Sequence, residues 1–236
     1  MRLEQIIDDY IKTEREEEGH IKSGLYVASS LGQCYRRQYF NRKDEPPTNP
    51  FDKRTLRVFQ VGTMFHEYIT EIYEAWWRTQ EGKDPLYLNY KVQKDDVIGY
   101  PDIVTDEEVV ELKTQHSRKF WYMHKKPELD IIIEQPEHVL QAVFYAACLD
   151  KPNIRLVYIS KDDLSIEEYP VVVSDFLKMK LDLEISTLND YWVKKALPPA
   201  EPRLYKDKEG KSKECSYCLW KDKCSEIEQG GKLCAV

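Results

Sequence analysis

Apolar residues recur every three or four positions in four stretches of the chain, with charged residues between them. This is the period of a helix with one buried face, so the sequence predicts an amphipathic helix over residues 2–18. A long helix is predicted from Arg54 to about Gln80, with Gly62 where another backbone can approach closely. Two more helices are predicted, from about Glu134 to Leu149 and from about Ser174 to Ala196.

Between residues 86 and 115 the composition changes to one typical of strands. Three segments rich in β-branched and aromatic residues, with polar clusters between them, predict a three-stranded antiparallel meander: LYLNYKVQ, VIGYPDIVT and VVELKTQ. A further hairpin, across Lys161 and Asp162, is predicted from IRLVYIS and SIEEYPVVV. Strands combined with long helices indicate an α/β fold.

Three segments are less regular. A short helix carrying Cys34 and Tyr39 is expected after Ser29 or Ser30, either of which could cap it. The segment HSRKFWYMHKKPELD is expected to be a loop or lid. The tail from about residue 197 has the composition of irregular structure, so something other than a core is expected to hold it.

Composition narrows the class of protein. A chain of 236 residues with 42% hydrophobic residues is long enough for one well-filled core, and we expect one compact unit. The sequence has no apolar run of about 20 residues and begins with an acidic amphipathic stretch, so we expect a cytoplasmic protein without a membrane partner. A net charge of -7 does not suggest a nucleic-acid binder, and any DNA site must be locally basic.

Two acidic residues and a lysine carry the candidate chemistry. Asp102 follows Pro101 at the end of one predicted strand, and Glu111 and Lys113 share one face of the next. A hairpin would bring the two carboxylates together, where they repel each other unless a cation lies between them. Mg²⁺ or Mn²⁺ suits such a site and makes a bound water more acidic for attack on a phosphodiester. Lys113 could hold that water or stabilise the charge that develops on the phosphate. Any charged hairpin contains these residue types, so the pattern alone is weak.

Other residues strengthen the pattern. His66 lies upstream in a predicted helix, and Gln141 and Tyr145 share one face of a later helix because they are four residues apart. The order GTxxH, PD, ExK and QxxxY, within about residues 29 to 224, resembles the RecB-like branch of the PD-(D/E)xK nucleases. The resemblance implies a restriction-endonuclease-like mixed β-sheet flanked by helices. It implies metal ligands at His66, Asp102, Glu111 and the backbone carbonyl of Leu112, and catalytic roles for Lys113, Asp102, Glu111, Gln141 and Tyr145.

The chain has six cysteines, which in a cytoplasmic protein indicate metal ligation rather than disulfides. Three form a Cys-x2-Cys-x5-Cys cluster in the tail, and Cys34 could complete a four-thiolate site that closes a long loop. Zinc and iron–sulfur clusters both accept four thiolates, so spacing leaves both open. Cys148 is expected in the core and Cys234 as a free thiol. The proposed ligands are Cys34, Cys215, Cys218 and Cys224.

The arrangement of one upstream and three downstream cysteines is similar to that of CRISPR-associated RecB-like exonucleases and AddB-type nuclease domains, which bind a 4Fe–4S cluster. The resemblance implies a 4Fe–4S cluster, with Zn²⁺ as the alternative. It also implies a single nuclease domain over residues 1–236, in which the cluster joins subregion 25–50 to subregion 198–236.

Mixtures of cations and aromatic rings suit single-stranded DNA, because cations follow the phosphates and rings stack on bases. One such mixture lies in the predicted loop and another lies beside Cys34. The aromatic residues could equally pin the loop to the body of the protein. The DNA-contact candidates are Arg36, Arg37, Arg118, Lys119, Trp121 and Tyr122.

The resemblance implies a metal-dependent DNA exonuclease acting on single strands or frayed ends, in CRISPR adaptation or phage recombination, with an integrase or helicase as partner. The alternatives are a structure-specific endonuclease, or a DNA-binding assembly subunit with a vestigial site. No GxxxxGK[ST] motif is present, so the chain does not power its own movement along DNA.

Overall fold

The computed structural model describes residues 2–19, 24–80, 87–88, 90–126, 128–204 and 212–233. The chain forms two compact units. The first comprises Met1–Tyr26, Gly32–Val58 and Ser186–Val236, and the second comprises Val27–Leu31 and Phe59–Ile185. Among the described residues, no helix combines the length and apolar character needed to cross a bilayer.

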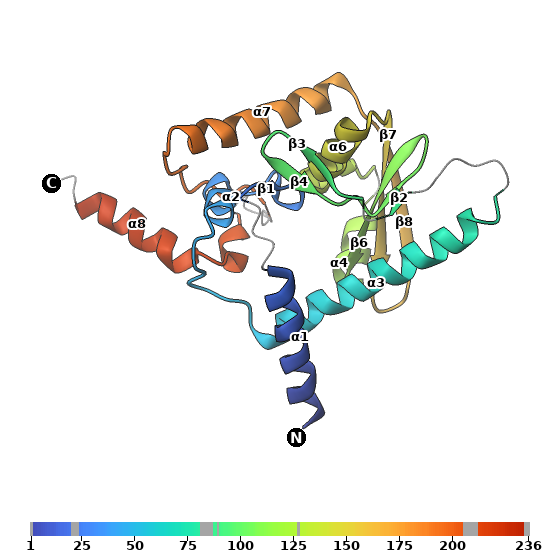
Figure 1. Ribbon diagram of the computed structural model, residues 1–236, viewed down its shortest axis with the longest axis horizontal. Helices are drawn as coiled ribbons and strands as arrows, with labels where there is room; N and C mark the ends of the chain where they lie inside the picture. Colours follow the sequence, from blue (N-terminus) through green and yellow to red (C-terminus); the bar gives the residue numbers. More distant parts are fainter. Residues whose placement is uncertain are drawn as a thin grey trace. The chain divides into compact units, whose positions relative to one another are not determined.

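A five-stranded mixed sheet forms the centre of the second unit, with strand order β2-β5-β6-β7-β8. The long middle strands β6 and β7 are parallel, and the other neighbouring pairs are antiparallel. Figure 1 shows β6, β7 and β8 side by side. A parallel pair needs a crossover connection, and helix α6 lies in it. The bounds of the strands are Tyr87–Leu88 (β2), Ile103–Val104 (β5), Glu108–Gln115 (β6), Asn153–Ser160 (β7) and Ile166–Val172 (β8).

The predicted meander over residues 86–115 is wrong in its topology. The described residues of the segment form five strands divided between two sheets, because β3 (Val92–Lys94) and β4 (Val97–Gly99) pair in a separate sheet of order β1-β4-β3. Strand β1 is Tyr26–Val27. The break between β4 and β5 falls at Pro101, whose nitrogen has no hydrogen to donate to a strand ladder. The hairpin of β7 and β8 is confirmed.

The four predicted long helices are confirmed to within a few residues. Helix α6 begins with Pro136 in its first turn, where a missing N–H does no harm, and ends at Asp150 in the left-handed region with φ 51°. The bounds are Leu3–Gly19 (α1), Lys53–Trp77 (α3), Pro136–Leu149 (α6) and Asp175–Val193 (α7).

The segment expected to be a loop or lid is largely helical, which corrects that expectation. Helix α4 (Ser117–His124) begins where the His116 side chain accepts a hydrogen bond from the Arg118 amide, and it buries Phe120 and Met123. These two residues are three apart, so they share one face of the helix. The one-turn helix α5 (Ile131–Glu134) follows.

The expected short helix begins later than predicted. Ser29 and Ser30 lie in a 3-10 helix, η1 (Ala28–Ser30), and Cys34 is the residue before helix α2 (Tyr35–Arg42). Neither serine therefore caps α2.

The tail is irregular over residues 197–204, as predicted, but its later part is not. That part forms η2 (Glu214–Tyr217) and α8 (Lys221–Leu233), and an aromatic core holds it within the first unit. Trp220 packs with Tyr39 and Phe40 of α2, and its indole N–H donates to the Glu45 carbonyl at 2.8 Å. These contacts are made between segments that lie more than 170 residues apart in the sequence, so local composition could not indicate them.

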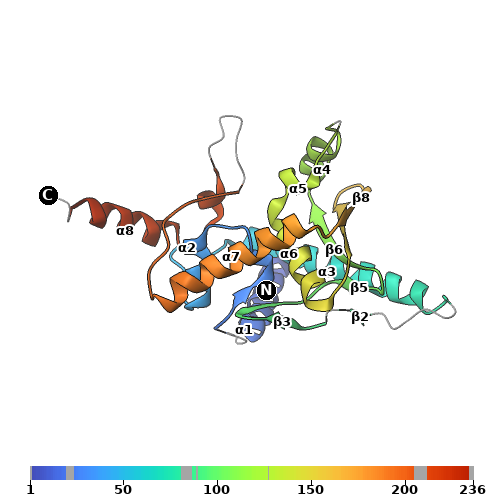
Figure 2. The ribbon, with the colours of Figure 1, turned by 90° about the horizontal axis from the view of Figure 1, so that it is seen from above.

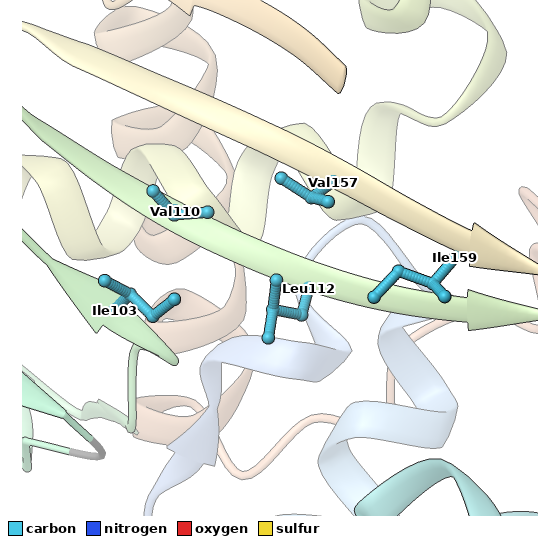
Figure 3. Close-up of a cluster of buried hydrophobic side chains, with 5 residues drawn as sticks. All are labelled: Ile103, Val110, Leu112, Val157 and Ile159. Atoms are coloured by element: carbon cyan, nitrogen blue, oxygen red, sulfur yellow. The ribbon is translucent and has the colours of Figure 1, made fainter. Parts of the chain in front are cut away.

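The core of the second unit orients the face of β6 that carries the candidate chemistry. Side chains of β5, β6 and β7 form an apolar cluster against helix α3 (Figure 3), namely Ile103, Val110, Leu112, Val157 and Ile159. Because neighbouring residues of a strand point to opposite faces, burying Leu112 in this cluster places Glu111 and Lys113 on the other face. Helix α6 covers that face, and both helices lie against the sheet in the two ribbon views (Figures 1 and 2).

Candidate active site and thiol cavity

The six side chains predicted for the catalytic site meet in the second unit, where β5 and β6 lie beside helices α3 and α6. Ile103 pairs with Val110 in the antiparallel ladder, so the preceding residue, Asp102, lies opposite Glu111. The contributors are His66 from α3, Asp102 before β5, Glu111 and Lys113 from β6, and Gln141 and Tyr145 from α6.

Asp102 is held at both carboxylate oxygens. Its Oδ1 lies 3.1 Å from Nδ1 of His66, and its Oδ2 accepts a hydrogen bond of 2.8 Å from the Leu112 amide. The Asp102 side chain is 11% exposed. The backbone of Leu112 therefore lies at the site, although the contact is made by its N–H and not by the carbonyl predicted as a ligand.

Lys113 connects the second carboxylate to helix α6. Its Nζ donates to Oε1 of Glu111 at 2.6 Å and to Oε1 of Gln141 at 2.9 Å. The Gln141 amide then donates to the Tyr145 hydroxyl at 3.1 Å. Since both acceptors lie on rigid elements, the ammonium is oriented by groups that themselves have little freedom.

Burial makes the charged form of Glu111 unfavourable. Burial raises its pKa to about 7, the nearby Lys113 ammonium opposes the rise, and the Asp102 carboxylate adds to it. Its Oε2 is buried and has no hydrogen-bond partner among the described residues. A buried carboxylate oxygen without a donor is costly, and a cation beside two carboxylates and an imidazole would satisfy it. The residues present therefore fit a divalent metal ion.

Two neighbours of the site were not predicted from the sequence. Gly99 lies against the ring of Tyr145, and a Cβ added there would lie 2.4 Å from Cε1 of that ring. His138, three residues before Gln141, bonds through Nδ1 to the Tyr158 hydroxyl at 2.8 Å. Burial keeps the pKa of His138 well below its usual value, and the positive charge of nearby lysines adds to this. Two sequence signals could have identified them: Gly99 is a glycine in a strand, and His138 is a polar residue at helical spacing from Gln141.

The aromatic residues of helix α4 were predicted either to pin this segment to the protein or to contact DNA. Phe120 is fully buried and anchors the helix, and the Trp121 indole donates to Oδ2 of Asp163 at 2.7 Å. Tyr122 is 69% exposed, so its ring is available to a ligand. The two predicted cations of this helix, Arg118 and Lys119, are also exposed.

The four predicted cysteine ligands line one cavity of about 360 Å³ in the first unit. All four are free thiols. Cys215 is exposed, and the other three are half-buried. Four thiols that line one cavity are the donor set that a thiolate-bound metal centre uses. Of the other cysteines, Cys148 is half-buried in α6, and Cys234 lies outside the described residues.

The two arginines predicted to contact DNA beside Cys34 both line this cavity. Arg36 is buried, and its guanidinium donates to the Cys224 sulfur at 3.2 Å, to Glu228 at 2.7 Å and to the Pro198 carbonyl at 2.7 Å. Arg37 is half-buried. These contacts commit Arg36 to the cavity wall, and DNA contact by either arginine stays a prediction.

Across the described residues, no group of three or more His, Cys, Asp or Glu side chains is arranged so that it could hold a metal ion as it stands. At the catalytic position this agrees with the direct contacts, because His66 and Lys113 each hold one carboxylate. Metal binding at either place is therefore a proposal.

No family model and no curated protein matches the chain. Solved structures do. The crystal structure of SSO0001 matches with a TM-score of 0.61 and 16% identity, covering 92% of this chain and 94% of that one. LHK-Exo in complex with dAMP matches with a TM-score of 0.50 and 15% identity, over 74% of this chain and 90% of its own. A second structure of LHK-Exo, an alkaline exonuclease from Laribacter hongkongensis, gives a TM-score of 0.46 at 15% identity, covering 76% and 97%. At such identities the likeness shows a shared fold, and that fold is the restriction-endonuclease-like α/β arrangement predicted from the sequence.

Proposed function

We propose that the protein is a metal-dependent DNA exonuclease that hydrolyses phosphodiester bonds of single-stranded or frayed DNA. The observation that carries the proposal is the pairing of His66 with Asp102 and of Lys113 with Glu111 at one site, where Oε2 of Glu111 has no partner among the described residues. The shared fold supports it, since LHK-Exo is an alkaline exonuclease and has been crystallised with dAMP. A mononucleotide is what an exonuclease releases from a DNA end.

The residues present divide the chemical work. Asp102, Glu111 and His66 would hold Mg²⁺ or Mn²⁺, with the Leu112 carbonyl beside them. When bound, such an ion supplies positive charge to the phosphate and makes water more acidic. Lys113 points into the same place and stabilises the charge that develops on the scissile phosphate.

Gln141 and Tyr145 act through the lysine. The Gln141 carbonyl holds the ammonium and its amide bonds to Tyr145, so the amine is positioned before substrate arrives. Burial raises the pKa of the Tyr145 hydroxyl, which keeps it protonated and able to donate.

The substrate preference rests on helix α4. The exposed ring of Tyr122 can stack on a base, and the Lys126 ammonium lies 5.6 Å from the centre of that ring, so a cation accompanies the aromatic face. Stacking on every base favours single strands without regard to sequence. Trimming of DNA ends in CRISPR adaptation or phage recombination, together with an integrase or helicase, would use this activity.

At the thiol cavity we propose a 4Fe–4S cluster with a structural role, with Zn²⁺ as the alternative. Four cysteines line one cavity, and either centre needs four thiolates. Protein purified without air should absorb broadly near ~400 nm and contain about four iron atoms per chain. Colourless protein with one zinc per chain would reject the cluster and leave the nuclease proposal unaffected.

The activity is tested with DNA labelled at either end, Mn²⁺ or Mg²⁺, and single- and double-stranded substrates. Wild type should release mononucleotides from an end, and EDTA should stop the reaction. Asp102→Ala and Lys113→Ala should each reduce the rate at least about a hundredfold. The control is Asp182→Asn, which removes a carboxylate at an exposed position of α7.

The products separate the alternatives. Internal fragments from branched or flapped DNA would identify a structure-specific endonuclease. Binding without cleavage would identify an assembly subunit with a vestigial site. Cleavage that survives both Asp102→Ala and Lys113→Ala would refute the site itself.

A further inference from the structure

A buried carboxylate lies beside the thiol cavity and has no assigned role. Glu214 directly precedes Cys215 and is 1% exposed. Burying a carboxylate is unfavourable unless donors surround it, so its contacts indicate what it does for the fold.

The donors of Glu214 come from two other segments of the first unit. Its Oε1 accepts a hydrogen bond of 2.8 Å from the Cys34 amide. Its Oε2 accepts from the amides of Arg203 and Leu204, at 2.7 and 3.2 Å. The carboxylate thus joins the residue before α2, the segment after α7 and the 3-10 helix that carries Cys215.

A second layer holds the carboxylate in place. The Ser212 hydroxyl donates to the Leu204 carbonyl and accepts from the Glu214 amide. Every one of these bonds has a backbone group as donor or acceptor, so the arrangement depends on where the chain runs.

We propose that Glu214 is a positioning residue that sets Cys34 against the three tail cysteines before a metal centre binds. The inference rests on the proposed metal centre at the thiol cavity. Bringing the amide of Cys34 to a group 180 residues away in the sequence removes much of the entropy that metal binding would otherwise lose. Without this contact, the upstream thiol would have to be ordered by the metal itself.

Co²⁺ is a suitable probe, because thiolate ligands give it a charge-transfer absorbance that carboxylate ligands do not. Metal-free full-length protein, kept reduced, is titrated with Co²⁺ as wild type and as Glu214→Gln. Glutamine keeps the size but offers one acceptor oxygen and places an NH₂ against backbone N–H groups. We expect Glu214→Gln to bind Co²⁺ about tenfold more weakly than wild type, or with a weaker thiolate absorbance. A tenfold change in affinity corresponds to ~1.4 kcal/mol.

Glu226→Gln is the matched control, since it makes the same change at an exposed position of α8, two residues from Cys224. It should bind Co²⁺ as wild type does. The urea midpoint of each metal-free variant is measured alongside, so that a loss of fold is seen separately. If Glu214→Gln does not fold, Glu214→Asp decides, because the shorter carboxylate cannot reach all three amides.

Wild-type affinity and spectrum in a folded Glu214 variant would overturn the positioning role. A wild-type protein that shows no thiolate absorbance with Co²⁺ would overturn the inference together with the metal centre. The nuclease proposal is judged separately by DNA cleavage, so its failure is distinguishable.

Discussion

Replacing Glu111 by glutamine should remove activity and, at neutral to alkaline pH, stabilise the metal-free protein. The carboxylate is fully enclosed, and burial raises its pKa from 4.5 to about 7 despite the Lys113 ammonium. Glutamine resembles the protonated form, keeps an acceptor for the lysine and carries no charge to bury.

The magnitude follows from the pKa. A rise from 4.5 to about 7 corresponds to about 3 kcal/mol, as an upper estimate, because each pH unit is worth about 1.4 kcal/mol. Since the folded state holds this proton more tightly than the unfolded state, the protonated carboxyl contributes its full stability below about pH 4.5. That stability is lost as the pH rises through about 7.

The assay is urea unfolding in EDTA between about pH 5 and 8.5, for wild type and Glu111→Gln. The variant should gain on wild type as the pH rises, by about 1–3 kcal/mol at pH 8. Adding Mn²⁺ should raise the stability of wild type by about 2.7 kcal/mol at a hundred times the dissociation constant, and should affect the variant far less. Glu71→Gln, exposed on α3, should stay within about 0.5 kcal/mol of wild type throughout.

If Glu111→Gln is less stable than wild type at pH 8 in EDTA, burying the ionised Glu111 does not destabilise the folded protein. The reasoning that a cation completes the site would then lose its physical basis.

Three further predictions concern the surroundings of the site. Gly99→Ala should destabilise the protein by about 1–3 kcal/mol in urea unfolding and lower activity, because the new methyl group would collide with Tyr145; unchanged stability and activity would contradict this packing. Gln141→Ala removes one acceptor of the Lys113 ammonium and should reduce kcat more than KM in steady-state cleavage assays, whereas a pure KM effect would argue against positioning. Tyr122→Ala should weaken binding of single-stranded DNA by about 1–3 kcal/mol in fluorescence anisotropy and leave the unfolding midpoint unchanged; equal affinity would remove α4 from the DNA path.

The sequence was most informative where a local period or a motif order carried the structure. The long helices were predicted because their apolar stripes are continuous, and Leu112 between Glu111 and Lys113 was enough to place both polar side chains on one face. The six candidate site residues were found by their order along the chain, and the structure brings them together.

Features that depend on distant contacts were missed. Helix α4 has only two buried apolar residues, Phe120 and Met123, among cations and exposed rings, so its period is weak. The tail is ordered by Trp220 against α2, which no window of nearby residues contains. The boundaries between the two units could not be predicted from the sequence either. Two of them fall inside helices α3 and α7 and not in linkers rich in Gly, Pro or Ser.

The composition of the first unit has a consequence for synthesis on the ribosome. Because the unit is assembled from three separate stretches of chain, the stretch that contains Cys34 emerges long before the one that contains Cys224. At about 5–20 residues per second, roughly 10–40 s pass before the partners of Cys34 exist. Throughout that interval the nascent first unit is incomplete and its early thiol is open to oxidants and stray metals, whereas the second unit, which ends at Ile185, is fully synthesised before Cys224.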